Sequence, residues 1–493
     1  MVNDKYEVVI GLEVHAQLLT KSKLFCGDSI SFGAAPNTHV SPVTLAHPGT
    51  LPVMNKEVIA LAVKLGIALN CKIEQHNYFA RKNYFYPDLP KGYQVSQHTA
   101  PICNGGFLTI QTSTGKKDVK LNRIHMEEDA GKSIHDLFDN YTAIDLNRAG
   151  TPLLEIVTEP DMHSAEEAFA YVTELRKLVR WLDVCDGNME EGSLRCDANI
   201  SVRLKGETKL GTRVEVKNLN SIRNVKRAIE IETDRLILIV ENGEEVIQET
   251  RSYNADNNTT FSLRSKEDAD DYRYFPEPDL PPFNITQQYI NFIKENMPEL
   301  PADLQEKYVT QHGLSQYDAA MLCTDKEDAA LYETITTKTG NYKTVANWIT
   351  GPVRNYCNEK EINLQSFPLS AAKISELIQF TETGKIHVNI ASTKLMEVMI
   401  AHPNEKPETL ALSMNLLLEN DTDALQKWID ETIASMPDKV KEYRTGKKGL
   451  IGLFAGQVKK LSKGKAGMEV VTKMLEASLN LCEEGTSNAI KKN

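Results

Sequence analysis

Charged and amide side chains alternate with apolar ones, residue by residue, in three stretches of the chain: 9–18, 193–204 and 213–217. Their polar positions include Glu13, His15, Gln17, Arg195, Asp197, Arg203, Arg213, Glu215 and Lys217. An ordinary solvated strand face should instead be rich in Thr, Ser and Lys. Carboxylates, an imidazole, guanidinium groups and amides are suited to hold a metal ion and phosphates. The pattern therefore indicates such a site, although the solvated face of a half-buried antiparallel sheet would also explain the alternation.

Another cluster of acids lies in the string IHMEEDAGK, which contains His125, Glu127, Glu128 and Asp129. Three consecutive carboxylates repel one another, and a bound cation would stabilise them next to the apolar residues of the same string. The following string, DLNRAGTPLLEIVTEPD, adds Asp145, Asn147, Arg148 and Glu155. Hard oxygen ligands with a single nearby imidazole favour Mg²⁺ or Mn²⁺ over Zn²⁺.

Strands and helices must position these groups. The period of two predicts a strand for each alternating stretch, because successive side chains of a strand point to opposite faces. Helical spacing of apolar residues predicts one helix over 164–182 and another from Ser221 through Leu236. The Pro-dense stretch 276–283 marks a boundary. Beyond it the sequence predicts helices over 287–296, 301–311, 315–323, 325–339 and 341–356.

Several long strings resemble GatB, the B subunit of the glutamine-dependent aspartyl/glutamyl-tRNA amidotransferases. Besides those quoted above, they are IGLEVHAQL, RKNYFYPDLPKGYQVSQ, EEGSLRCDANISVR, VEVKNLNSIRNVKRAIEIE and DYRYFPEPDLPP. The resemblance implies an α+β fold with an N-terminal antiparallel-sheet cradle similar to the glutamine synthetase/guanido kinase fold. An all-α middle domain and an all-α YqeY-like tail would follow. With a second break at 401–407, the expected domains are 1–285, 286–404 and 405–493.

The resemblance also implies a reaction. Glu on tRNA(Gln) or Asp on tRNA(Asn) is activated by ATP and then amidated with ammonia that a separate amidase releases from glutamine. A carboxylate is a poor acyl donor to ammonia because its leaving group would be oxide, so transfer of the γ-phosphoryl group of ATP first makes an acyl phosphate. Catalysis then consists mostly of placement and charge neutralisation. The expected partners are the amidase, which is the A subunit of such enzymes, their small C subunit and misacylated tRNA.

We assign site residues on this basis. The expected ligands of Mg²⁺ or Mn²⁺ are Glu13, His15, Glu128 and Glu155. Glu127, Asp129 and Asp197 are expected either as alternative ligands or as residues that contact the ligands without binding the ion. Phosphate oxygens of ATP are expected to contact Lys132, Arg148, Arg195, Arg203 and Lys217. The sequence has no GxxxxGK[ST] loop, so side chains or a different backbone arrangement must hold the nucleotide.

Aromatic and basic residues interleave in RKNYFYPDLPKGYQ, as suits a single-stranded RNA end whose bases stack. Core aromatics beside a Pro turn are the commoner explanation of such a string. In the family this motif borders the reaction centre, which implies that Lys82, Tyr84 and Tyr86 hold the acceptor end of the tRNA.

A zinc site is not expected. Many relatives carry a zinc knuckle of four cysteines near the N-terminus, whereas this chain has Cys26 but Asp28, Ser41 and Thr44 at the other matching places. One thiolate cannot supply a structural zinc site. The eight cysteines also lie far apart, so the sequence suggests neither a CxxC motif nor a disulfide framework.

The net charge of −12 at first argues against a nucleic-acid partner. Between residues 439 and 465, however, nine basic residues accompany a single acid, Glu442. An acidic body with one basic segment is typical of a protein that holds a polyanion with its tail, although a solvated lysine-rich face would look the same. The resemblance favours tRNA contact, with Lys447, Lys448, Lys459, Lys460, Lys463 and Lys465 as the expected contact residues.

No stretch approaches the ~20 apolar residues of a membrane span. The N-terminus, MVNDKYEVVIG, lacks a basic segment followed by an apolar one, so we expect a cytoplasmic protein without a membrane partner. Two other functions stay open: a tRNA-binding scaffold without phosphoryl transfer, and a stand-alone amide ligase related to glutamine synthetase. The acidic cluster argues against the first, and the basic tail argues against the second.

Overall fold

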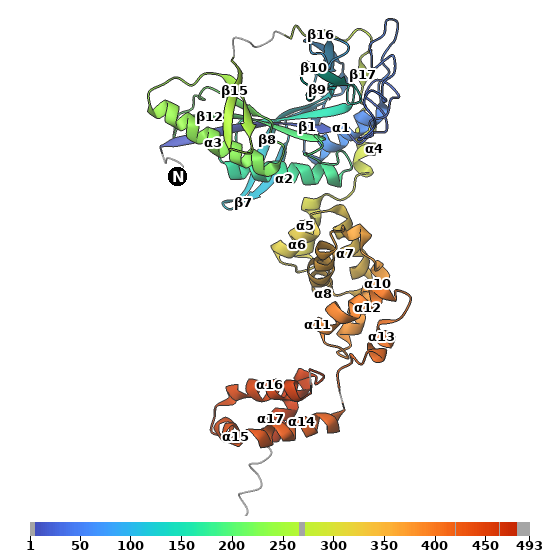
Figure 1. Cartoon of the computed structure of the whole chain (residues 1–493), viewed down its shortest axis with the longest axis vertical. Coiled ribbons are helices and arrows are strands. Elements are labelled where there is room, and N and C mark those ends of the chain that lie inside the picture. Colours follow the sequence, from blue (N-terminus) through green and yellow to red (C-terminus); the bar gives the residue numbers. More distant parts are fainter. Residues whose placement is uncertain (1–4, 266–271, 420, 463, 481–493) are drawn as a thin grey trace, which may run out of the picture. The chain divides into compact units, whose positions relative to one another are not determined.

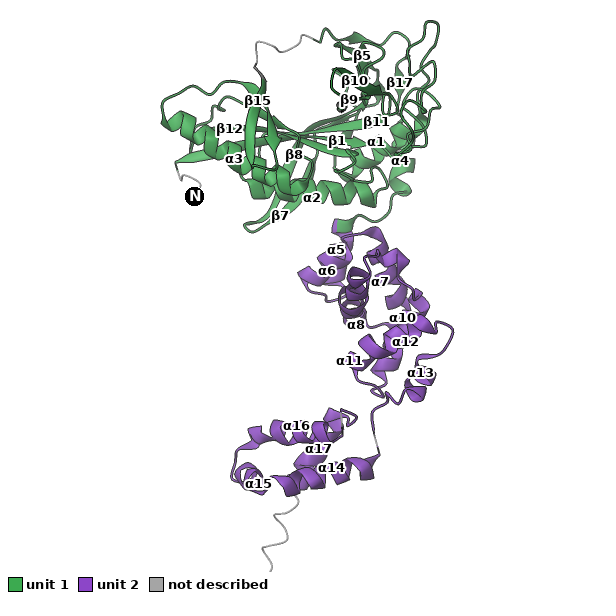
Figure 2. Cartoon of the chain, viewed as in Figure 1, with its two compact units in different colours: residues 1–301 green, residues 302–493 purple. Residues whose placement is uncertain are grey.

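The computed structural model describes residues 5–265, 272–419, 421–462 and 464–480 (Figure 1). The chain divides into two compact units, residues 1–301 and residues 302–493 (Figure 2). Unit 1 combines strands and helices, whereas the described part of unit 2 has helices as its regular elements.

Unit 1 contains a large mixed sheet and smaller strand pairs. Its strands are β1 (Tyr6–Gln17), β2 (Lys72–Ile73), β3 (His76–Asn77), β4 (Ala80–Asn83), β5 (Tyr93–Ser96), β6 (Cys103–Asn104), β7 (Phe107–Thr112), β8 (Gly115–Glu128), β9 (Lys132–Phe138), β10 (Tyr141–Asp145), β11 (Pro152–Thr158), β12 (Leu194–Leu204), β13 (Val214–Lys217), β14 (Glu249–Asn254), β15 (Thr259–Ser265), β16 (Phe275–Pro276) and β17 (Phe283–Asn284). Its helices are α1 (Lys56–Ala68), α2 (Ala165–Trp181), α3 (Ile222–Glu241) and α4 (Gln287–Glu295).

The large sheet has the strand order β15-β14-β13-β12-β1-β11-β8-β6-β2, and β7 pairs with β8. Neighbouring strands are antiparallel except β13 and β14, which are parallel. The three strands predicted from alternation are confirmed as β1, β12 and β13. In β1 the apolar positions Ile10, Leu12 and Val14 are fully buried, as a sheet with one core face requires.

Two amphipathic helices, α2 and α3, contact each other and run along one side of the sheet (Figure 1). Ser164 and Ser221 cap them, since each serine hydroxyl accepts a hydrogen bond from the backbone three residues later. Both helices begin where the sequence predicts. Their buried faces, including Leu175 and Val179 of α2 and Val225 of α3, contribute to the core of unit 1. The opposite face of the sheet is thereby left for polar side chains.

Small strand pairs extend unit 1 beyond the large sheet. β4 pairs with β5 and β16, β3 pairs with β17, and β9 pairs with β10. The sequence predicts a boundary at the Pro-rich stretch 276–283. The strands at its two ends, β16 and β17, pair with β4 and β3 of unit 1. The expected division of the chain into three domains stays a prediction.

Unit 2 is built from helices joined by short turns. They are α5 (Pro301–Thr310), α6 (Gln316–Leu322), α7 (Lys326–Thr339), α8 (Tyr342–Trp348), η2 (Ile349–Val353), α9 (Arg354–Glu359), η3 (Leu364–Ser366), α10 (Ala371–Glu382), α11 (Val388–Ile390), η4 (Ala391–Leu395), α12 (Met396–Ala401), α13 (Pro407–Ser413), α14 (Thr422–Ser435), α15 (Pro437–Arg444), η5 (Lys448–Leu450), α16 (Ile451–Leu461) and α17 (Met468–Asn480). The helix predicted over 341–356 is not one regular α-helix. It changes to a π-helical turn at η2, where Pro352 lacks the backbone N–H that an α-helix needs.

The last helices of unit 2 share a small apolar core of their own. Its buried members are Leu425, Ile429, Val440, Tyr443, Phe454, Ala455, Val458, Ala466, Val471, Leu475 and Leu479. They come from α14 to α17 and the turn before α17, so the described residues of the basic segment 439–465 lie within a folded helical region. Over the described residues, no helix combines the length and the apolar character that a membrane crossing requires.

Candidate active site

Three neighbouring strands, β8, β11 and β1, bring histidine and glutamate side chains together on the sheet face that lacks the apolar core residues. His15 of β1 lies directly opposite Glu155 of β11, and Glu155 lies opposite His125 of β8. Glu13 and Glu127 each lie two residues from a histidine and therefore share its face. We call these five residues the His–Glu cluster.

Glu155 is at the centre of the His–Glu cluster. Its Oε2 lies 3.2 Å from His125 Nε2 and 3.6 Å from His15 Nε2. His15 Nε2 is also 3.4 Å from Glu13 Oε1, and His125 Nε2 is 3.6 Å from Glu127 Oε2. His15 Nε2 also lies 3.9 Å from Glu127 Oε1, so five carboxylate–imidazole contacts link the cluster, three of them between residues on different strands.

Burial favours the neutral forms of His125, His15 and Glu155, but the opposite charges around these three groups outweigh it. Burial acts to lower the pKa of His125, yet the carboxylates of Glu155 and Glu127 raise that pKa to about 9. The pKa of His15 is also raised against its burial, by Glu155 and Glu127. Burial acts to raise the pKa of Glu155, whereas the two imidazoles hold it well below its usual range. In the metal-free cluster His125 and Glu155 therefore form an ion pair, whereas burial and the neighbouring Glu155 raise the pKa of Glu13.

The cluster can offer ligand atoms to a divalent cation in two overlapping groups. One consists of Glu13, His15 and Glu155, and the other of His125, Glu127 and Glu155. Within each group the ligand atoms lie within 4.8 Å of one another. Carboxylate oxygens with imidazole nitrogens are suitable ligands for such an ion, and the imidazoles would give up their protons on binding. Because Glu155 belongs to both groups, it is the central ligand candidate.

A cavity of about 350 Å³ opens beside the cluster. Its lining residues are Glu13, Lys82, Gln97, His98, Arg123, His125, Glu127, Glu155 and Tyr274. Arg123 Nη2 lies 3.9 Å from Glu155 Oε1, and the rings of His98 and Tyr274 stack at a centroid distance of 4.0 Å. The cavity therefore joins carboxylates, cations and aromatic rings in one space.

Glu128, which we expected to be a metal ligand, does not join these groups within the described part of the chain. Consecutive residues of a strand point to opposite sides, so Glu128 turns away from its neighbour Glu127. Its carboxylate accepts a hydrogen bond from the backbone N–H of Val95 at 2.8 Å and contacts the Lys91 ammonium. Both glutamates are buried. Glu127, expected as an alternative ligand, is the glutamate that belongs to the His–Glu cluster.

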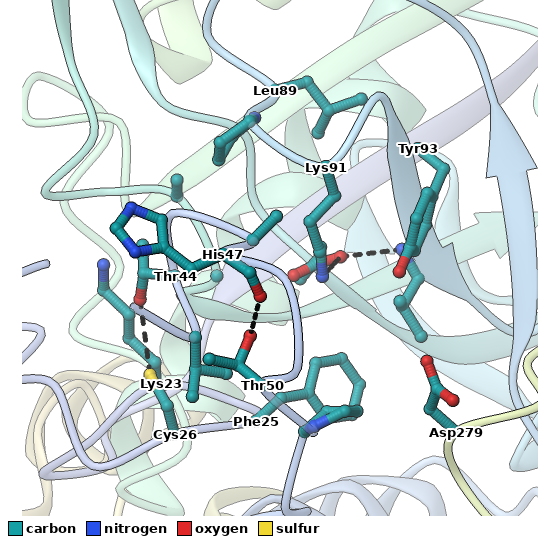
Figure 3. Close-up of a pocket in the computed structure, with 18 of the residues that line it drawn as sticks. Lys23, Phe25, Cys26, Thr44, His47, Thr50, Leu89, Lys91, Tyr93 and Asp279 are labelled. Carbon is teal, nitrogen blue, oxygen red and sulfur yellow. Dashed lines mark hydrogen bonds and ion pairs between the residues drawn. The ribbon is translucent and has the colours of Figure 1, made fainter. Parts of the chain in front are cut away.

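The Lys91–Glu128 pair lies in a second cavity, of about 130 Å³ (Figure 3). Figure 3 shows Lys91 and Tyr93 on one side of this cavity and Cys26 and Thr44 on the other. Another lining residue, Lys23, is fully buried and donates to the carbonyl oxygens of His39 and Leu146 at 2.7 and 3.3 Å. Burial lowers the pKa of Lys23.

Asp129 serves as an acceptor for other side chains. Its Oδ2 receives hydrogen bonds from Gln17 Nε2 at 2.7 Å and from Arg195 Nη2 at 2.8 Å. Arg195 lies opposite His15 on the neighbouring strand β12, and its buried Nε has no hydrogen-bond acceptor among the residues that the structure describes. Arg148 Nε is 3.8 Å from Asp129, but Arg148 donates mainly to the backbone carbonyl oxygens of residues 130 and 131. Of these two expected phosphate ligands, Arg195 is the one that adjoins the cluster.

The remaining expected phosphate ligands are spread over the unit. Lys217 Nζ lies 2.6 Å from Asp197 Oδ2, and Asp197 is opposite Glu13, so this pair adjoins the cluster. Arg203 instead pairs with Glu7 at 2.7 Å, six residues from Glu13 and therefore ~20 Å away along β1. Lys132 is exposed at the start of β9, which pairs with β10 outside the large sheet. The structure thus brings Arg195, Asp197 and Lys217 to the cluster but neither Arg203 nor Lys132.

The four positions expected to replace a zinc knuckle lie close together. Cys26 Sγ is 3.3 Å from Thr44 Oγ1, which donates a hydrogen bond to Asp28 Oδ2 at 2.5 Å. The backbone N–H of Ser41 donates to the same oxygen at 2.7 Å. Burial acts to raise the pKa of Asp28, but these hydrogen bonds lower it overall. The carboxylate of Asp28 therefore connects the two ends of the loop over residues 26–44 through hydrogen bonds.

The residues expected to contact tRNA fall into two regions. Tyr84 and Tyr86 form an edge-to-face pair, and Tyr86 is half exposed, whereas Lys82 lines the cavity beside the cluster. In unit 2, Lys459 and Lys460 are exposed at the end of α16. The other tail candidates have mixed surroundings: Lys447 pairs with Glu442, Lys448 lies over the Tyr443 ring, Lys465 donates to Asn415, and Lys463 lies outside the described residues.

His125 lies in the acidic string described above, but the sequence alone suggested no role for it. Tyr274, Gln97 and Arg123 were not predicted to belong to the site. A signal for His125 was present. The strand of Glu13 and His15 has the pattern Glu-x-His, and the acidic string contains the reverse pattern, His-x-Glu, at residues 125–127. Each pattern places an imidazole and a carboxylate on one strand face. The other three residues carry no local signal of this kind.

Comparisons with known proteins agree over most of the chain. Residues 8–291 match a family model described as the GatB/GatE catalytic domain, and residues 330–479 match one described as the GatB domain. A protein of Paraburkholderia xenovorans (strain LB400), named as the B subunit of an aspartyl/glutamyl-tRNA(Asn/Gln) amidotransferase, is 48% identical over 488 residues, which cover 97% of this chain and 99% of that protein. Proteins of the same name from Alkalilimnicola ehrlichii and Thermodesulfovibrio yellowstonii are 47% and 46% identical; they cover 97% and 96% of this chain, and 100% and 98% of their own lengths are matched.

Proposed function

Because the chain belongs to the family of aspartyl/glutamyl-tRNA(Asn/Gln) amidotransferase B subunits, we propose that it carries the ATP-dependent step of that enzyme. In this proposal it phosphorylates the side-chain carboxylate of Glu-tRNA(Gln), Asp-tRNA(Asn) or both. Ammonia then displaces the phosphate and forms the amide. The observation that carries the proposal is the His–Glu cluster, since a scaffold that only binds tRNA has no use for it.

The residues near the cluster suit phosphoryl transfer. A divalent cation, Mg²⁺ or Mn²⁺, would neutralise phosphate charge when bound to either ligand group, Glu13, His15 and Glu155 or His125, Glu127 and Glu155. Arg195 lies opposite His15 on the neighbouring strand, and Asp129 fixes its Nη2 through a hydrogen bond. An arginine held in this way can donate to a phosphate oxygen without first being ordered. Lys217, held by Asp197, supplies a second cation at the same side of the cluster.

The proposal includes a division of labour with other proteins. The chain activates the acyl group, and ammonia comes from glutamine hydrolysis on the amidase, the A subunit, joined by a small C subunit. Ammonia released into water would be lost or protonated, so the subunits must stay assembled during turnover. The relatives share a name that denotes one subunit of an amidotransferase, which supports a multi-subunit enzyme. We place this enzyme in the cytoplasm, with no zinc requirement.

Fold and tail complete the proposal. Antiparallel strands that carry metal-ligand candidates on one face support a cradle similar to that of glutamine synthetase, within a domain spanning residues 1–285. Residues 286–404 would form a helical domain, and residues 405–493 a YqeY-like domain that grips tRNA. The exposed Lys459 and Lys460 support that last role.

A single substitution tests the catalytic proposal. In the assembled enzyme, His15→Ala removes an imidazole from the cluster and should abolish tRNA-dependent ATP hydrolysis, while glutamine hydrolysis by the partner remains measurable. His135→Ala, at an exposed histidine of β9, is the matched control and should change neither activity. If the His15 variant phosphorylates misacylated tRNA at the wild-type rate, the chain acts as a scaffold and the proposal is wrong.

A further inference from the structure

The Lys82 ammonium lies in an unusual environment for a cation. β4 carries this lysine, which lines the cavity beside the cluster together with Glu127 and Tyr274. Its Nζ is 4.7 Å from the centre of the Tyr272 ring and 5.7 Å from that of Tyr84. Within the described ranges, Lys82 Nζ has these ring contacts but neither a hydrogen bond nor an ion pair.

Nearby negative charge keeps Lys82 protonated. Burial acts to lower the pKa of Lys82, but Glu127, the neighbouring tyrosines and Glu155 raise it above its usual value. The ammonium has three N–H donors, and a partly enclosed cation without acceptors is costly. The aromatic rings offset part of this cost through cation–π attraction, yet they accept no conventional hydrogen bond. A ligand that carries a hydrogen-bond acceptor would therefore supply what the Lys82 ammonium lacks.

We propose that Lys82 binds the side-chain carboxylate of the aminoacyl group on misacylated tRNA, an inference that rests on the proposed function. A carboxylate carries one negative charge, which a single ammonium can match, whereas a triphosphate calls for several cations. Glu127 and Glu155 line the same cavity, so a carboxylate bound to Lys82 is placed beside the candidate metal ligands. Placement of this kind is what phosphoryl transfer requires.

The same contact would discriminate between substrate and product. The carboxylate of a glutamyl group attracts the ammonium, whereas the amide of a glutaminyl group is neutral and has nearly the same shape. Lys82 would thus hold the substrate more tightly than the product. This role differs from contact with a tRNA phosphate, which would be equally strong before and after amidation.

Equilibrium binding of three forms of tRNA(Gln) to the assembled enzyme, without ATP, tests the inference. The forms are uncharged tRNA, Gln-tRNA and Glu-tRNA. We expect the wild-type enzyme to prefer Glu-tRNA over Gln-tRNA by about 10- to 100-fold, the range for a hydrogen bond to a charged group. Lys82→Met keeps the length of the side chain but not its charge, and should remove this preference while leaving the affinity for uncharged tRNA unchanged.

Two further variants complete the experiment. Lys82→Arg keeps the charge and should retain most of the preference, which shows that the Met variant loses a charge rather than its fold. Lys116→Met removes an exposed lysine at the far end of β8 and should behave as wild type.

Several outcomes would overturn the inference. An equal loss of affinity for all three forms in Lys82→Met would show contact with an RNA phosphate. Absence of a preference in the wild-type enzyme, or its survival in Lys82→Met, would place the carboxylate elsewhere. Failure of the proposed function would look different, because the wild-type enzyme would then form no acyl phosphate with ATP, whatever its binding preference.

Discussion

Metal binding at the His–Glu cluster should depend steeply on pH, because the metal ion and protons compete for the same imidazoles. The pKa of His125 is raised to about 9, so at pH 7 this ring is ~99% protonated in the metal-free protein. A metal ion can bind its Nε2 only after the proton leaves. We therefore expect binding to release about one proton from His125 at pH 7, in addition to any from His15.

The magnitude follows from the pKa. Each displaced proton makes the apparent affinity rise about tenfold per pH unit up to the pKa. Between pH 7 and pH 9, His125 alone should thus strengthen Mn²⁺ binding about fiftyfold, or about 2.3 kcal/mol, because half of the rings are still protonated at pH 9. Above pH 9 its contribution should level off. The stability of the metal-free fold has the opposite pH dependence. The ion pairs of His125 contribute fully to it below about pH 6.5, and this contribution is lost as the pH rises through about 9.

Isothermal titration of chelator-treated protein with Mn²⁺, in buffers of different ionisation enthalpy, measures both the affinity and the number of protons released. His125→Asn should release about one proton fewer at pH 7 and should flatten the pH dependence. His135→Asn, outside the cluster, should match the wild-type protein. If wild-type affinity stays constant between pH 7 and pH 9 and no proton is released, the electrostatic account of the cluster is refuted.

Three other predictions concern neighbouring parts of the chain. Asp129→Asn should raise the KM for ATP about tenfold or more through loss of a charged hydrogen bond to Arg195, with Mn²⁺ affinity unchanged; an unchanged KM would contradict this positioning role. Asp28→Ala should destabilise its loop by about 1–3 kcal/mol, seen as faster hydrogen exchange over residues 26–44. Lys459→Ala with Lys460→Ala should weaken tRNA binding and reduce its log–log salt slope by roughly 0.7 to 0.9 for each lost phosphate contact, whereas a merely solvated lysine face would leave the slope unchanged.

Local periodicity was enough to predict one of the three strands of the cluster, β1, and two of its five residues. Alternation identified β1 and placed Glu13 and His15 on one face, because the side-chain period of a strand does not depend on its partners. The same rule separates Glu127 from Glu128. Apolar Ile124 and Met126 define the buried side of β8, so Glu127 must face the other side with His125. The charge of the consecutive acids does not distinguish Glu127 from Glu128, whereas the alternation of the strand does.

Pairing between distant segments could not be read from the sequence in the same way. The meeting of His125, Glu155 and His15 depends on the register of three strands, which the whole sheet determines. The family resemblance of its string, which mixes basic and aromatic residues, predicts that Lys82 holds the acceptor end of the tRNA. Its position in the cavity depends on Tyr272 and Tyr274, which come from a segment nearly two hundred positions later.

The return of residues 275–284 to β3 and β4 has a consequence for the order in which the protein is made. Arg81 binds Glu277 across 196 residues, and β16 pairs with β4 beside this contact. At ~5–20 residues per second, a ribosome needs about 10 to 40 s to add those residues. During that time one edge of β4 has no partner strand, and an open edge invites pairing with other chains. A nascent chain therefore cannot complete the cavity beside the His–Glu cluster until almost all of unit 1 has been synthesised, and we expect partner proteins to assemble on it only afterwards.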